Sequence, residues 1–245
     1  MADESVPGAD VSPVILREDG PLLVVDKPAG VLTEGVPHHV PTLVGSVKRW
    51  LVARGPKPGS AYLGVVHRLD RPVSGALAFA LTSKAAARLA EEFREHRVAK
   101  AYLAVVERAP AEPTGELVDW LAKVPDRAHV LVVDATAPGA REARLRYRTI
   151  AAVAGGALLE VVPLTGRMHQ IRVQCARRGW PIVGDTQYGA TTAFPGVAPR
   201  DPRDGAIALH ARRLALAHPI RRDEVVVTSP LPAAWVGLGV DGNVL

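Results

Sequence analysis

The chain has 245 residues, is 48% hydrophobic and carries a formal net charge of +5, which indicates a globular protein with a substantial core rather than a disordered or fibrous chain. No run approaches the ~20 apolar residues that span a bilayer, and the one cysteine, Cys175, excludes an internal disulfide and a cysteine-rich metal site. Residues 1–10 show no secretory signal, so we expect a cytoplasmic protein.

Charge is distributed unevenly along the chain. Residues 1–26 hold six acidic side chains and one basic one, so the remainder carries a net charge of about +10. A basic body favours a polyanionic partner, nucleic acid above all, although a merely soluble basic protein fits the same count. We expect a disordered acidic tail over residues 1–13, one folded domain over 14–235 and a C-terminal tail over 236–245.

Short apolar runs separated by Gly and Pro predict a sheet-rich fold, and three stretches have helical signals. The predicted strands are 22–26, 76–81, 97–106, 117–121, 129–133, 143–150, 157–164, 208–216 and 225–228. The predicted helices run from Thr42 to Arg54, from Thr82 or Ser83 to about His96, and from Thr165 to Gly179.

A dense group of polar residues interrupts the apolar run of residues 65–80. His67, Arg68, Asp70 and Arg71 all fall in a turn between two predicted strands, where functional side chains are common. Asp70 is the only carboxylate among these cationic neighbours, which favours its ionised form and suits it to be a nucleophile or a base. The simpler interpretation is that Asp70 only accepts hydrogen bonds from local backbone N–H groups.

Two later stretches supply further candidates. Lys100, Tyr102 and Ala104 share one face of a predicted strand, and a tyrosine there is most often a core residue. Arg167 falls near the predicted start of the third helix, where the helix macrodipole disfavours a cation. We therefore expect Arg167 to have an anionic partner, for which Asp70 is suitable.

These stretches together resemble the RluA-type RNA pseudouridine synthases. The matching strings are V-V-D-K-P-A-G at 24–30, H-R-L-D-x-x-V-S-G at 67–75, K-x-Y-x-A-x-V at 100–106, T-G-R-x-H-Q-I-R at 165–172 and G-x-P-I-x-G-D-x-x-Y-G at 179–189. One departure is Val73, which stands where the family usually has Thr. The resemblance implies an α+β fold with a mixed, mainly antiparallel sheet, flanking helices and a catalytic cleft across the sheet.

The resemblance also implies roles for individual residues. Asp70 would be the catalytic nucleophile, Arg167 would hold it in place, and Tyr102 would pack beside the target base and assist proton removal. Arg68 would fill the gap left by a flipped base, although it could instead be a second partner of Asp70. The other residues that we expect at the substrate site are Lys27, His67, His169, Gln170 and Ile171, with hydrogen bonding behind the site the simplest role for His169 and Gln170.

The implied reaction converts a uridine in RNA to pseudouridine, and the substrate would be a stem-loop of rRNA or tRNA. The reaction replaces a C–N bond with a C–C bond, so we expect no cofactor. We expect a monomer without an obligate protein partner, and about 20 residues upstream are too few for an S4 RNA-binding domain.

Other functions remain open from the residues alone. The domain could be an inactive RNA-binding protein on the same fold, an interpretation that Val73 keeps open. A retaining glycosidase would need a second carboxylate, and the motifs offer only Asp26 and Asp185. A metal site built from His67, Asp70 and His169 is disfavoured by the surrounding arginines.

Overall fold

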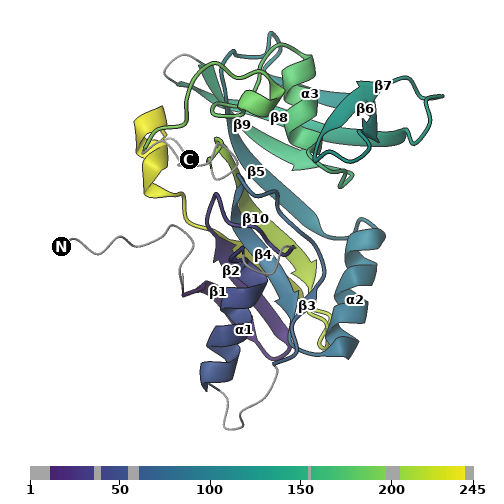
Figure 1. The fold of residues 1–245 in the computed structure, drawn as a ribbon, viewed down its shortest axis with the longest axis vertical. Coiled ribbons are helices and arrows are strands. Elements are labelled where there is room, and N and C mark those ends of the chain that lie inside the picture. Colours follow the sequence, from purple (N-terminus) through teal and green to yellow (C-terminus); the bar gives the residue numbers. More distant parts are fainter. Residues whose placement is uncertain (1–11, 36–39, 55–60, 154–155, 197–204, 241–245) are drawn as a thin grey trace.

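The computed structural model describes residues 12–35, 40–54, 61–153, 156–196 and 205–240 (Figure 1). Most of the expected N-terminal tail, residues 1–11, lies outside the described residues. Within the described ranges, none of the helices is both long and apolar enough to cross a membrane.

One mixed sheet of 11 strands runs through the described part of the chain, in the order β1-β2-β4-β10-β5-β9-β8-β6-β7, with β3 beside β4 and β11 beside β10. The strands are β1 (Val14–Asp19), β2 (Leu22–Lys27), β3 (Gly64–Val65), β4 (Ser74–Ala80), β5 (Ala99–Val106), β6 (Thr114–Lys123), β7 (Val130–Val133), β8 (Arg141–Val153), β9 (Gly156–Pro163), β10 (Leu209–Ala217) and β11 (Glu224–Thr228). Every pairing is antiparallel except that of β4 with β10. The expected α+β class, with a mainly antiparallel mixed sheet, is confirmed.

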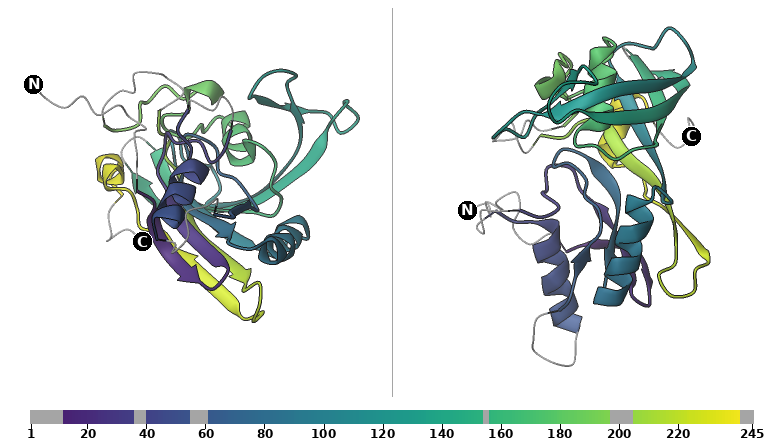
Figure 2. Two further views of the ribbon diagram at one scale, coloured as in Figure 1. Left: turned by 60° about the horizontal axis from the view of Figure 1, so that its bottom comes forward. Right: turned by 90° about the vertical axis from the view of Figure 1, so that its right-hand side faces the viewer.

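Three helices pack on this sheet: α1 (Leu43–Arg54), α2 (Ser83–Arg94) and α3 (Gln170–Arg177). In Figures 1 and 2, α1 and α2 lie beside the lower half of the sheet and α3 lies on the upper half. Alternation along β2 explains the first two: Leu23 and Val25 join the cluster that contains α1, whereas Leu22 and Val24 join the cluster that contains α2. The two helices therefore cover opposite faces of the same strands.

The predicted caps of the first two helices are confirmed. The Thr42 hydroxyl accepts a hydrogen bond from the Gly45 N–H at 3.1 Å, and the Thr82 hydroxyl accepts one from the Ala85 N–H at 3.3 Å. Both helices therefore begin one residue after their capping threonine.

Gly75 allows the one parallel pairing in the described sheet. Its φ is +119°, and a Cβ at this position would lie 2.4 Å from the carbonyl oxygen of Ala211 on β10. Only glycine permits so close an approach of two backbones. The pairing fixes the start of β4 directly after the polar turn of residues 67–73.

The folded region contains a strand that was not predicted at its N-terminal end, and it extends past the predicted boundary at its C-terminal end. Residues 14–19 form β1, an edge strand whose half-exposed pattern is too weak to stand out in the sequence. At the other end, residues 233–238 form a short 3-10 helix, and Leu238 and Val240 are buried. The boundary at residue 235 is therefore too early, because the apolar residues beyond it complete the core around Trp235.

Candidate active site

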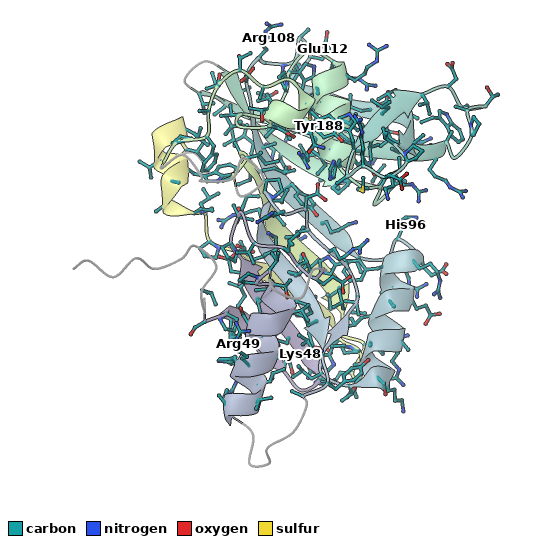
Figure 3. All side chains as sticks on the ribbon, viewed as in Figure 1. Lys48, Arg49, His96, Arg108, Glu112 and Tyr188 are labelled. Atoms are coloured by element: carbon teal, nitrogen blue, oxygen red, sulfur yellow. The ribbon has the colours of Figure 1, made fainter. Side chains whose placement is uncertain are left out.

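A pocket of about 580 Å³ lies between the C-terminal end of α2, the polar turn before β4, strand β5 and the segment that leads into α3. His96 and Tyr188 are labelled in Figure 3, with His96 at the end of α2 that points toward the upper half and Tyr188 in that upper half. The charged and histidine side chains that line the pocket are His67, Arg68, Asp70, Arg94, His96, Lys100, Arg167, His169 and Arg172. Asp70 is the one carboxylate among the described lining residues.

The loop that carries Asp70 is fixed by the segment that follows β2. The Thr33 hydroxyl donates to the carbonyl of Leu69 at 2.9 Å, and the N–H of Gly30 donates to the carbonyl of Arg71 at 2.8 Å. The Arg71 guanidinium returns a hydrogen bond to the carbonyl of Gly30 at 2.9 Å. These bonds position Asp70, whose side chain is 27% exposed.

Lys27 lies beneath this loop rather than in the pocket. Its side chain is fully buried, and its ammonium donates to the carbonyls of Pro28, Val31 and Arg71 at 2.9, 2.7 and 3.1 Å. Burial lowers the pKa of this ammonium to about 7, and the charge of Asp70 opposes the shift. The expected contact of Lys27 with substrate is therefore corrected: it holds the loop, and no surface of it is left for a ligand.

Arg172, and not Arg167, is the arginine against Asp70. Its Nη1 lies 3.4 Å from Asp70 Oδ2, and its side chain is only 4% exposed. The guanidinium is held from behind by Asp185, which accepts hydrogen bonds from Nε at 2.7 Å and from Nη2 at 2.8 Å. Gln187 accepts a third from Nη2 at 2.9 Å. Such a two-point arginine–carboxylate contact fixes the guanidinium plane that faces Asp70.

The pairing of Arg167 with Asp70 is wrong because the helix begins later than Thr165. Helix α3 starts at Gln170, after His169 adopts a left-handed conformation with φ of 51°. Arg167 thus lies in the preceding loop, where its Nε donates to the carbonyl of Glu142 at 2.9 Å and its side chain is exposed. The macrodipole argument does not apply to a residue outside the helix.

Gln170 organises this loop. Its side-chain oxygen accepts hydrogen bonds from the Thr165 hydroxyl at 2.7 Å and the Arg167 N–H at 3.0 Å, and its amide donates to the carbonyl of Arg144 at 3.0 Å. Gln170 is 4% exposed, so its role is to fix backbone behind the pocket. The neighbouring Ile171 contributes apolar wall to the pocket and also joins the main core.

His169 lies between Asp70 and a second aromatic residue. Its Nε2 is 3.9 Å from Asp70 Oδ2, and its Nδ1 is 2.9 Å from the hydroxyl of Tyr188. Tyr188 in turn accepts a hydrogen bond from the Val130 N–H at 3.1 Å. This chain of contacts joins the Asp70 side of the pocket to the start of β7.

Tyr102 lines the pocket from β5, two residues from Lys100 on the same face. Burial raises the pKa of its hydroxyl far above the usual value, and the charge of Asp70 raises it further. The hydroxyl is therefore protonated at neutral pH. It suits packing against a ring or donating a hydrogen bond better than removing a proton unaided.

Two other residues singled out in the sequence, Arg68 and Val73, differ in their exposure to solvent. Arg68 is at the surface, 71% exposed, and contacts Glu34 at 3.3 Å rather than Asp70. Val73 is buried at 2% exposure and lines the pocket, so the position carries an apolar wall without a hydroxyl.

The contacts of His67 do not suit a metal ligand. Its Nε2 accepts a hydrogen bond from the Ala78 N–H at 2.9 Å, and its ring stacks on Phe93 at a centroid distance of 4.3 Å. Among the described residues, no group of three His, Cys, Asp or Glu side chains is arranged to hold a metal ion. Burial lowers the pKa of His67 to about 3, with the charge of Lys100 adding to the effect, so the ring is neutral.

Two neutral histidines, the half-buried His67 and the fully buried His210, predict that the fold loses stability in mild acid. Burial lowers the pKa of His67 to about 3 and that of His210 to about 4, whereas both titrate near 6.5 once unfolded. Protons then bind the unfolded chain but not the native one as the pH falls below 6.5, so stability decreases down to the native pKa values. His210, which is fully buried, should contribute a loss of about 2 kcal/mol between pH 7.5 and 5.

Urea unfolding of wild type and His210→Gln at the two pH values tests this. The wild type should lose about 2 kcal/mol more than the variant on acidification. Equal losses would contradict a neutral His210 in the fold.

Four residues of the site were not predicted from the sequence: Arg172, Asp185, Gln187 and Tyr188. Arg172 stands in the T-G-R-x-H-Q-I-R string five residues after Arg167, between two apolar residues that are buried. An arginine within the buried stretch of a helix needs a carboxylate partner, and this was the signal available.

The structure is an α+β domain in which an open mixed sheet carries a basic pocket. Asp70 is the one carboxylate among the described residues that line this pocket. The model of the RNA pseudouridylate synthase family matches residues 21–177, and the chain belongs to this family. It is 33% identical to tRNA pseudouridine synthase C of Pasteurella multocida over 245 aligned residues, covering 91% of this chain and 93% of that protein.

One further relative and one solved structure are also similar to most of this chain. The chain is 34% identical to ribosomal large subunit pseudouridine synthase D of Nitrosomonas europaea, covering 89% of this chain and 62% of that protein. It thus spans less than two thirds of the length of several curated relatives. The human RNA pseudouridylate synthase domain-containing protein 1 has a similar structure, with a TM-score of 0.69, 28% identity, and coverage of 93% of this chain and 87% of that one.

Proposed function

We propose that this protein isomerises a specific uridine in RNA to pseudouridine, with Asp70 as the nucleophile. The observation that carries the proposal is the contact of Asp70 with Arg172, at 3.4 Å, in a basic pocket that belongs to a pseudouridine synthase domain. A carboxylate in contact with a buried, fixed guanidinium is oriented for nucleophilic attack.

The chemistry needs one nucleophile and one proton transfer. The N1–C1′ bond of the uridine breaks, the uracil turns, and a C5–C1′ bond forms. C5 then loses its proton and N1 gains one, so product and substrate have the same atoms. Asp70 would attack either C6 of the base or C1′ of the ribose, and both paths use a single carboxylate.

Tyr102 is proposed to pack on the uracil and to orient it rather than to remove the C5 proton directly. Its protonated hydroxyl, next to Asp70, suits positioning a water or a carbonyl oxygen of the base. The proton acceptor is then a water or the departing carboxylate.

The target base must leave its stack to reach Asp70, at a cost of a few kcal/mol. RNA loops expose bases at the lowest cost, so a stem-loop is the proposed substrate. Arg68 is exposed at the mouth of the pocket, where its guanidinium plane could stack on the bases next to the gap. The relatives named as acting on the ribosomal large subunit and on tRNA support rRNA or tRNA as the class of substrate.

A monomer without an obligate protein partner remains part of the proposal. A cytoplasmic location remains part of the proposal. A glycosidase is disfavoured, because the two other motif carboxylates are engaged elsewhere: Asp26 accepts from the Ser229 hydroxyl at 2.8 Å and Asp185 holds Arg172.

Release of the C5 hydrogen tests the reaction class even while the target uridine is unidentified. Total RNA labelled with tritium at C5 of uridine, from cells that lack the protein, would be incubated with the full chain. We expect tritium to pass into water in an amount that saturates with time at a small, fixed fraction of the uridines. No release above a heat-denatured control would overturn the proposed function.

A further inference from the structure

Lys100 lines the pocket from β5 but takes no part in the contacts around Asp70 described above. Its side chain is partly buried, and a Cβ placed on Gly166 would lie 3.8 Å from its Nζ. The ammonium therefore lies near the loop that precedes α3. Tyr102 is two residues along the same strand face, about 7 Å away by strand geometry.

This ammonium is without a partner in the described part of the chain. No described side chain or carbonyl forms an ion pair or hydrogen bond with it. Burial lowers its pKa, and no carboxylate offsets that effect. A partly buried cation without a partner is costly for folding, so its presence calls for a ligand that supplies negative charge.

The surroundings specify the sign and the size of that ligand. Besides Lys100, the rim carries Arg94, His96 and Arg167, and the one acid among the described lining residues, Asp70, is already in contact with Arg172. His96, which lines the pocket, stands at the end of α2 in Figure 3. The pocket, at about 580 Å³, is much larger than one base needs, which leaves room for the backbone next to that base.

We propose that Lys100 forms a binding site for a phosphate of the RNA strand, the one that flanks the uridine placed over Asp70. This assignment rests on the proposed function, because it takes the polyanion to be RNA. Lys100 then fixes the position of the strand along β5, and its contact is made on binding rather than during the chemical step. It is a positioning residue for the sugar–phosphate backbone, independent of base identity.

The substitution Lys100→Met tests this, because it keeps the length and apolar stem of the side chain and removes the charge. The probe is a fluorescein-labelled RNA hairpin with seven uridines in its loop, titrated by anisotropy at several salt concentrations. The dissociation constant should rise about tenfold or more, and the slope of log affinity against log salt should become shallower by about 0.7–0.9. Lys100→Arg should restore most of the affinity.

Lys84→Met is the matched control. Lys84 is exposed at the opposite end of α2 and does not line the pocket, so its removal should change affinity less than twofold. Thermal unfolding of Lys100→Met should be unchanged or shifted upward, because the variant removes an uncompensated charge. A lysine with a merely structural role would give the opposite result, a loss of stability with unchanged RNA affinity.

Measurements of kcat and KM distinguish a failure of the phosphate assignment from a failure of the proposed function. In the tritium-release assay, Lys100→Met should raise KM about tenfold or more and leave kcat within threefold. A fall in kcat with unchanged hairpin affinity, or an affinity and salt slope equal to wild type, would overturn the phosphate assignment. If wild type releases no tritium while Lys100→Met still weakens hairpin binding, the proposed function fails and the phosphate site stands.

Discussion

Asp70→Asn is expected to reduce pseudouridine formation by at least about 10³-fold, because the amide cannot act as the nucleophile. The substitution keeps the shape of the side chain and a hydrogen-bond acceptor for Arg172, whose Nη1 lies 3.4 Å from Asp70 Oδ2. RNA affinity should therefore stay within about threefold of wild type. The measurement is tritium release under single-turnover conditions, together with hairpin binding at the same salt concentration.

Asp134→Asn is the matched control for this variant. Asp134 is exposed in the turn after β7 and outside the pocket, so the same change of charge there should leave the rate within twofold of wild type. If Asp70→Asn retained more than a tenth of the wild-type rate, Asp70 would not be the nucleophile.

Arg172→Lys is expected to reduce kcat by about 100-fold or more, a larger loss than Arg167→Lys will cause. A lysine retains the charge but cannot hold Asp185 at two points and also reach Asp70, so the carboxylate loses its orientation. The same variant should lower the free energy of unfolding by roughly 1–3 kcal/mol, because the buried guanidinium loses its hydrogen bonds to Asp185 and Gln187.

Arg167→Lys distinguishes the two arginines. Arg167 is exposed and its guanidinium contacts a backbone carbonyl, so the lysine variant should change kcat by less than threefold and unfolding hardly at all. Both variants would be compared in single-turnover tritium release and in urea unfolding. Equal losses of kcat, or a larger loss for Arg167→Lys, would contradict the assignment of Arg172 to Asp70.

The fold was predictable wherever a local pattern and the tertiary structure favour the same conformation. The caps at Thr42 and Thr82 and the apolar runs of β2 and β4 are strong local signals, and the structure follows them. Edge strand β1 and the segment around Leu238 depend on contacts with distant residues, and their own sequence patterns are weak.

The site was predictable by residue type but not by pairing. The sequence places Asp70 in a polar turn and Tyr102 on a strand face, and both line the pocket. Choosing between Arg167 and Arg172 required the start of α3, which depends on the left-handed conformation of His169. The burial of Lys27 was equally hidden, because three backbone carbonyls that meet only in the folded loop surround its ammonium.

Mapping of pseudouridine in RNA from cells that lack this protein, after incubation with wild type or Asp70→Asn, tests the central claim most directly. Wild type should add pseudouridine at one or a few discrete uridines in rRNA or tRNA, and Asp70→Asn should add none while it still binds RNA. The same new sites with both proteins would show that Asp70 is not the nucleophile. No new site with either protein, although both bind RNA, would contradict isomerisation and favour an inactive RNA-binding domain.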